Sequence, residues 1–157
     1  MDRRTFLSCA SVVAIGAFSG CTGRASDTGD GVILPRVELG NATNESQTFH
    51  LLIEFNDNIA HWDSYEVGPT FAEQGMGSEM IDPDLPDESG AVTAHVRIGS
   101  ERASIDFEEE GYGDGDCVIA TFLYGFRGED QLSAHPVTVD ENWGVSEQIA
   151  CPPPDGD

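Results

Sequence analysis

Four cysteines are the residues of this sequence with the most distinctive chemistry, and they fall into two groups. Cys9 lies in an N-terminal apolar run, and Cys21 follows that run directly. Cys117 and Cys151 lie far along the chain, where a single pair of thiols in an exported protein predicts a disulfide. Metal ligation and free reactive thiols are the alternatives for this pair.

The order of residue types before Cys21 indicates export and lipidation. Arg3 and Arg4 precede the apolar run at 9–18, which is the order of a twin-arginine signal. The run is shorter than the roughly 20 apolar residues that a membrane-spanning helix needs. Small residues at 19–20 then lead into Cys21, as in a lipobox, so we expect cleavage before Cys21 and attachment of membrane lipid to its thiol. An uncleaved anchor and a simple signal peptide with a coincidental cysteine are the alternatives.

Cleavage at this position would divide the chain into four segments. We expect a signal peptide over 1–20, a flexible tether of small and polar residues over 21–31, a folded domain over 32–151 and an unfolded tail over 152–157. The mature chain is long enough for one domain with one core. Its expected location is the extracytoplasmic face of a cell membrane, held there by the lipid on Cys21.

The composition is strongly acidic. Without its signal, the chain keeps 28 acidic residues against five arginines and contains no lysine, a formal charge of −23. Such self-repulsion opposes the compact state in dilute buffer, whereas at 1 M salt the Debye length shrinks to about 3 Å. The bias is typical of halophilic proteins, and we interpret it as an adaptation for solubility rather than as a cation-binding function. Because little basic charge is present to neutralise phosphates, nucleic acid is excluded as a partner.

Period-two alternation predicts an all-β domain. The clearest strand covers 48–55, and a turn at 56–58 with a return over 59–67 predicts a hairpin. On the first strand, Ile33, Val37 and Leu39 are expected to share one face. The other expected strands cover 92–98, 103–107, 117–126, 132–139 and 145–151, with 117–126 central and Pro136 on an edge strand.

Seven or eight short strands without a convincing amphipathic helix favour one antiparallel β-sandwich, immunoglobulin-like in the broad sense. By analogy with such domains, Trp62 is expected to pack near the disulfide. Residues 68–90 are expected to form a long irregular connection that carries function or is simply mobile.

The candidate metal ligands fit metal sites poorly. No histidine follows Cys117 until His135, and no methionine follows it at all, so the ligand set of a blue-copper protein is absent. The four histidines fall on four different expected strands without pre-built metal spacing; two could meet across a sheet. Weak calcium candidates crowd one loop, although prolines interrupt them and chance explains acidic clusters here: Asp82, Asp84, Asp87 and Glu88.

Asn41 and Asn44 each begin an N-glycosylation sequon on an expected turn, for which simple turn chemistry is the alternative interpretation. No nucleophile elbow, phosphate loop or dinucleotide fingerprint occurs, so no catalytic residue and no cofactor is assigned.

The order of these features resembles small haloarchaeal twin-arginine lipoproteins with an immunoglobulin-like β domain. The resemblance rests on the signal, the tether, the segment at 37–43, the segment at 59–62, and cysteines at the start of a late strand and near the C-terminus. It covers roughly residues 1–67 and 91–151, with 68–90 as an insertion. It implies location and fold and supplies no catalytic residues.

The function expected is therefore that of a non-enzymatic binding or structural module on the membrane surface, with an unknown protein or small-molecule partner. The alternative is an exported enzyme or metal-binding protein whose site the sequence does not reveal. A solute receptor for a transporter is disfavoured, since such receptors usually need two lobes around a cleft.

Overall fold

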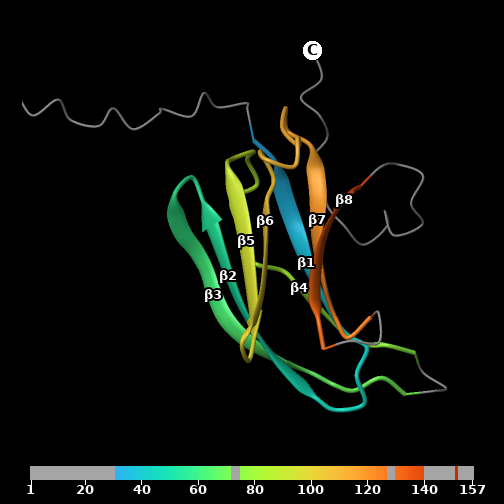
Figure 1. Cartoon of the computed structure of the whole chain (residues 1–157). Helices are drawn as coiled ribbons and strands as arrows, with labels where there is room; N and C mark the ends of the chain where they lie inside the picture. Colours follow the sequence, from blue (N-terminus) through green and yellow to red (C-terminus); the bar gives the residue numbers. More distant parts are fainter. Residues whose placement is uncertain (1–30, 72–74, 127–129, 140–150, 152–157) are drawn as a thin grey trace, which may run out of the picture.

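The computed structural model describes residues 31–71, 75–126, 130–139 and 151, and none of these residues is helical. Two four-stranded sheets pack face to face, with the strand orders β4-β1-β7-β8 and β3-β2-β5-β6 (Figure 1). The strands are β1 (Ile33–Asn41), β2 (Gln47–Phe55), β3 (Asn58–Val67), β4 (Gly77–Ile81), β5 (Val92–Ile98), β6 (Glu101–Asp106), β7 (Cys117–Tyr124) and β8 (Leu132–Thr138). The expected all-β sandwich is confirmed.

One strand pair departs from the expected antiparallel pattern, because β1 and β7 run parallel. These strands are first and seventh in the chain, so no hairpin turn dictates their relative direction. Every other pair of named strands is antiparallel. As expected, β7 is a central strand, and β8 with Pro136 forms an edge.

The β2–β3 hairpin is confirmed, and its turn explains its register. Asn56 and Asp57 have φ values of 50° and 62°, and Phe55 pairs with Asn58 across them. Positive φ at both central residues is the pattern of a type I′ turn, whose twist matches that of the flanking strands. The next hairpin turns at Gly99 and Ser100, so Ile98 pairs with Glu101.

The core lies between the sheets and is apolar because alternate residues of each strand point inward. Phe49, Leu51 and Ile53 of β2 have no exposed surface. On β1, Val37 and Leu39 are buried as expected, but Leu34 is buried in place of Ile33. The register with β7 shifts between Ile33 and Arg36, and this irregularity exchanges the faces of the residues before it.

The segment 68–90 contains more regular structure than its sequence indicates. Residues of β4 pair with β1 from Val37↔Ile81 to Asn41↔Gly77, so this part of the segment completes a sheet. Several expectations fall on residues that are not described: those on Arg3, Arg4 and Cys21, on the tether as far as residue 30, on residues 145–150 of the strand expected over 145–151, and on the tail. Within the described part of the chain, no helix has the length and apolar character to cross a membrane.

Candidate functional site: a basic face on one sheet

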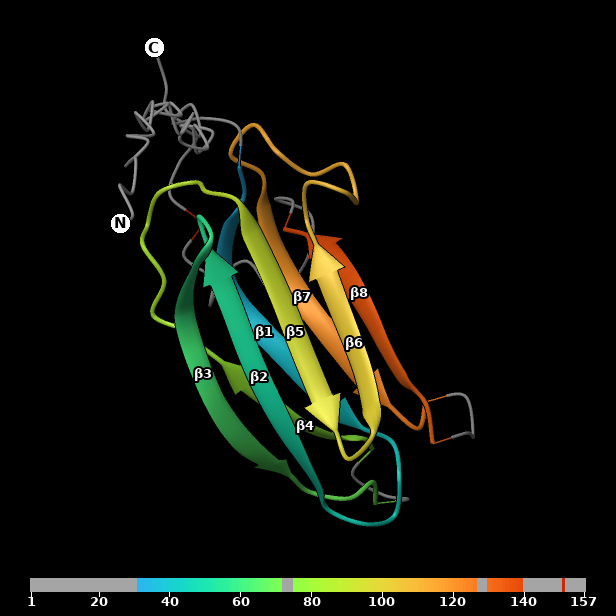
Figure 2. The ribbon, with the colours of Figure 1, turned by 60° about the vertical axis from the view of Figure 1, so that its left-hand side comes forward.

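Figure 2 shows the β3-β2-β5-β6 sheet in front of the other sheet. The outer side of this sheet carries an unusual group of side chains. Two neighbouring rows of outward-pointing residues cross all four strands without a single carboxylate. We call these eight residues the basic face. One row is Ser64, His50, Arg97 and Arg102, and the other is Trp62, Leu52, His95 and Ser104.

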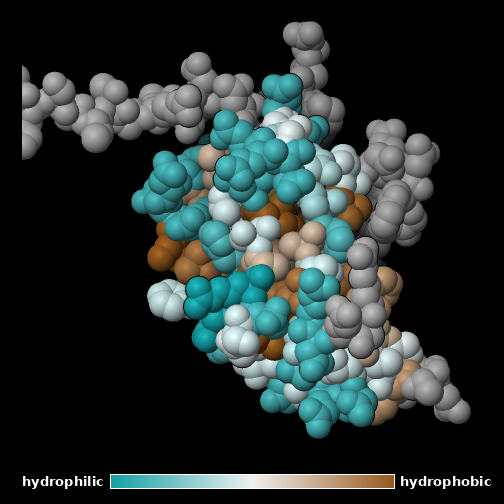
Figure 3. Space-filling view, viewed as in Figure 1, coloured by the Kyte–Doolittle hydropathy of each residue, from teal (hydrophilic) through white to brown (hydrophobic). Residues whose placement is uncertain are grey.

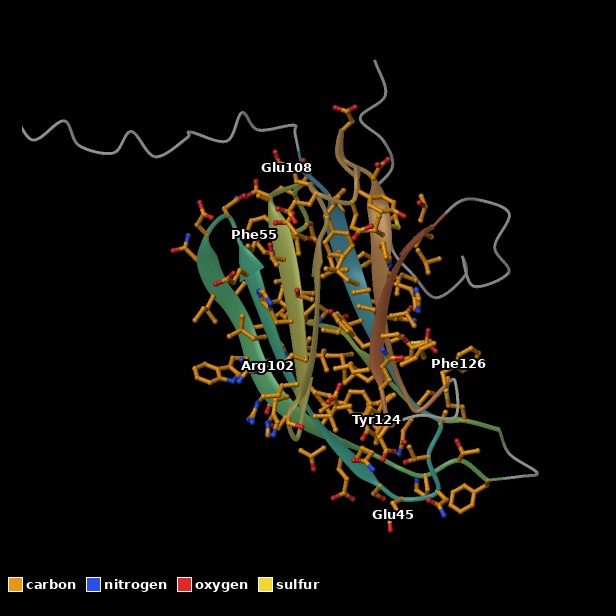
Figure 4. All side chains as sticks on the ribbon, viewed as in Figure 1. Glu45, Phe55, Arg102, Glu108, Tyr124 and Phe126 are labelled. Atoms are coloured by element: carbon orange, nitrogen blue, oxygen red, sulfur yellow. A yellow bond between two sulfur atoms is a disulfide. The ribbon has the colours of Figure 1, made fainter. Side chains whose placement is uncertain are left out.

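Two arginines define the basic face. Arg97 on β5 pairs directly with Arg102 on β6, and both side chains are exposed. Arg102 lies towards the lower end of the sheet in Figure 4. Neither arginine has an ion pair or hydrogen bond within the described residues. Like charges directly opposite each other destabilise an antiparallel pair. The chain has 29 acidic residues and only seven arginines, so two arginines opposite each other depart strongly from its composition.

An aromatic and apolar row lies beside the arginines. Trp62 is 73% exposed and pairs with Leu52, which in turn pairs with His95 on β5. The eight residues surround an open depression of about 720 Å³ on the sheet. A tryptophan this exposed offers a flat apolar surface with one hydrogen-bond donor at its edge.

The histidines of the basic face have polar neighbours. His50 Nδ1 lies 2.7 Å from Ser64 Oγ, and His95 Nε2 lies 3.5 Å from Glu54 Oε2. Glu54 belongs to the next outward row, towards the β2–β3 turn, and its partner Thr93 pairs with Asp106. Glu54 and Asp106 therefore flank the basic face next to the row that contains His95. Arg97 and Arg102 lie in the other row, which is farther from these carboxylates.

The wider surface is polar. In Figure 3, hydrophilic residues cover most of the side of the domain that is in view, and hydrophobic residues show mainly between the two sheets. The basic face differs from the neighbouring row of Glu54 and Asp106 in the sign of its charge, and it carries the exposed Trp62.

A second polar group lies on β3, on the side that faces the other sheet. His61 Nε2 is 2.9 Å from Tyr65 Oη, and the two rings stack with centroids 6.2 Å apart. Burial raises the pKa of Tyr65, and the negative charges of Asp63 and Glu79 raise it further. The phenol is therefore protonated at neutral pH, which suits a hydrogen-bonding role at the sheet edge.

A third polar group, centred on Asn41, holds the turn after β1 together by hydrogen bonds. The Asn41 side chain is completely buried, and its Nδ2 donates to the carbonyl oxygens of Glu45 and Gly68 at 2.7 and 2.9 Å, with that of Val67 at 3.2 Å. Its Oδ1 accepts from the backbone N–H and the hydroxyl of Thr43. With its amide hydrogens used and no exposed surface, Asn41 has no room for a glycan. Asn44, by contrast, is exposed.

The structure joins Cys117 and Cys151 in a disulfide, with Cα atoms 6.1 Å apart. It does not gather the calcium candidates Asp82, Asp84, Asp87 and Glu88: within the described ranges no three His, Cys, Asp or Glu side chains could hold a metal ion together. Asp82 instead accepts the backbone N–H of Asp84.

Trp62 was expected beside the disulfide, and this expectation is wrong. Trp62 lies on the outer side of β3, whereas Cys117 begins β7 in the opposite sheet. The arginine pair was not singled out from the sequence, although a signal was present. A two-residue turn at 99–100 places residues 97 and 102 opposite each other, which is the information needed to find the pair.

Comparison with known proteins adds no assignment to this geometry. No family model matches the sequence, and no curated protein matches it significantly.

Proposed function

We propose that this protein is a non-enzymatic binding module, anchored by lipid at the extracytoplasmic face of a membrane, which holds an anionic partner on its basic face. The observation that carries the binding role is the pairing of Arg97 with Arg102, without any carboxylate partner among the described residues. Their mutual repulsion costs stability, and a bound anion would relieve it. A guanidinium group also binds carboxylates and sulfates through two parallel hydrogen bonds.

The anchored location rests on the signal and on Cys21. The domain begins near Val32, which bridges to Gly90 just before β5, so the tether joins at the end of the sheet where β5 starts. Arg97 lies five residues beyond Val92, or about 17 Å further along the strand. The arginines thus lie at the end of the domain away from the tether, which suits a partner outside the membrane.

Titration of the arginine side chains with a simple dianion tests the binding role. Glutarate would be added to the isotopically labelled mature protein at constant ionic strength, while the Nε–Hε resonances are followed by NMR. We expect the Arg97 and Arg102 resonances to shift and saturate together, while that of Arg36 on β1 stays in place. Parallel, unsaturating shifts of all arginines would contradict a site on the basic face.

The location has its own test. A Cys21→Ser chain should be released into the medium or keep its signal uncleaved. A variant that is processed and remains membrane-bound like the parent would rule out the lipid anchor.

A further inference from the structure

We propose that the partner is an acidic polysaccharide, with a sugar ring stacked on Trp62 and carboxylate or sulfate groups of nearby sugars paired with Arg97 and Arg102. This inference rests on the proposed function and names the ligand class of the same face. It follows from the shape of the face, its spacing and the charge of the whole chain.

The shape of the basic face suits a chain-like ligand. The depression is open and crosses four strands, whereas small-molecule sites are usually enclosed. Strands lie about 4.8 Å apart and alternate residues about 6.8 Å apart along a strand. Trp62 is two strands and one outward row away from Arg97, so their Cα atoms are separated by about 12 Å. The corresponding separation from Arg102 is about 16 Å, which is longer than a single sugar ring.

The two rows match the two chemical features of an acidic sugar, namely the apolar C–H face of its ring and its charged substituent. The exposed face of Trp62, next to Leu52, can cover the C–H surface of a pyranose ring. Arg97 and Arg102 offer planar, permanently charged groups that fit carboxylate and sulfate oxygens. Ser64 and Ser104 end the two rows with hydroxyl groups able to bond sugar hydroxyls.

The negative net charge of the chain restricts which class of polyanion can bind. The chain carries −22 overall, so long-range repulsion opposes every polyanion, and the one that binds must gain its affinity from contacts at short range. An acidic polysaccharide carries its charged groups on sugar rings whose C–H faces are uncharged, so it can place carboxylates or sulfates on the arginines while a ring contacts Trp62; polyphosphate has no such ring. Because bidentate bonds and stacking act at contact distance, they persist in the salt that screens longer-range charge.

The experiment compares four polymers for binding to the purified mature protein in about 1 M sodium chloride, where the Debye length is about 3 Å. The probes are alginate, which carries carboxylates, dextran sulfate, neutral dextran and inorganic polyphosphate. We expect alginate or dextran sulfate to bind at least about tenfold more tightly than either of the other two, and the better of the pair identifies the acidic group.

Four variants locate the site. Trp62→Ala and the double change Arg97→Ser with Arg102→Ser should each weaken binding by about tenfold or more, as is usual for tryptophan and arginine contacts. Trp62→Phe should retain much of the affinity, because it keeps an aromatic ring. Arg24→Ser removes one positive charge from the expected tether, half the charge change of the double variant, and serves as the control; it should bind like the parent.

Equal binding of polyphosphate or of neutral dextran would overturn the polysaccharide assignment. So would affinity that survives the Trp62→Ala change. If no polymer binds while glutarate still shifts Arg97 and Arg102, the ligand class is wrong and the anion site stands. If glutarate also fails, the proposed function itself is wrong.

Discussion

The turn at Asn41 and the basic face are two polar regions of this domain with opposite designs. The Asn41 side chain is fully buried, neutral, and hydrogen-bonded through both its oxygen and its nitrogen. Arg97 and Arg102 are exposed, charged and without partners among the described residues. Buried polar groups must be satisfied within the fold, whereas exposed ones remain available to something else. The first region therefore specifies structure, and the second is where a ligand is expected.

Salt should produce the largest effect and should act on the charged surface alone. With −22 formal charges, repulsion reaches about 30 Å at 0.01 M ionic strength and about 3 Å at 1 M. We expect removal of salt to lower the free energy of unfolding by several kcal/mol, a large part of the ~5–15 kcal/mol of a typical domain. Thermal unfolding followed by circular dichroism across this salt range measures it. A midpoint that does not move would reject the halophilic interpretation.

Asn41→Ala should cost about 4 kcal/mol, because it removes the Asn41 donor from the carbonyl oxygens of Val67 and Gly68 and leaves the Thr43 N–H without its acceptor. No charge changes, so the loss should be the same at low and high salt. Chemical denaturation at two salt concentrations checks both statements. Asn44→Ala, three residues before β2 and exposed, is the matched control and should change stability little. A salt-dependent loss would mean that the Asn41 turn is coupled to the surface charge.

Arg102→Glu should separate stability from binding. The substitution places a carboxylate opposite Arg97, and replacing a like-charge pair by an opposite-charge pair stabilises a sheet by about 0.5 kcal/mol. Measured at 1 M salt, the variant should unfold at slightly higher denaturant concentration while losing alginate or dextran sulfate binding. A variant that is less stable and still binds would show that the arginine pair is structural.

The smallest expected effect is a pH dependence of the free energy of unfolding that comes from two tyrosines, Tyr65 and Tyr124. Burial raises the pKa of Tyr65 and of Tyr124, with further increases from Asp63 and Asp130 respectively. The fold holds these phenol protons more tightly than the unfolded chain, whose tyrosines have the ordinary pKa of 10.0. The stabilisation is therefore fully present below pH 10 and is lost as the pH rises through the higher folded values.

Unfolding free energies measured between neutral pH and about pH 11 test this, since the ordinary tyrosine pKa falls within that range. The Tyr65→Phe variant should flatten part of the decline, because it removes one of the titrating groups. An equally steep decline in the Tyr65→Phe, Tyr124→Phe double variant would assign it to other groups.

Much of the fold follows from alternation, because each strand of a sandwich has one buried side. The β2–β3 hairpin and the central position of β7 could both be predicted in this way. β4 could not, since its residues pair with β1 residues 36 to 44 positions earlier in the chain, and such a pairing leaves little local pattern. The position of Trp62 was predicted by analogy and failed, because alternation within β3 places it on the outer side. The basic face could not be predicted either, because the register that aligns its residues across four strands cannot be read from the sequence of any single strand.

The position of β1 has a mechanical consequence. Its N-terminal end is where the expected tether enters the domain; β7 pairs with it from Ile33 to Asn41, and β4 pairs with its second half, from Val37 to Asn41. If a ligand held on the opposite sheet is pulled away from the membrane, the load runs along β1 rather than across it. Its hydrogen bonds to β4 and β7 then resist together in shear, instead of opening one at a time as at a hairpin end. A strand in this position would suit the domain to transmit force between the proposed membrane anchor and the proposed polymer.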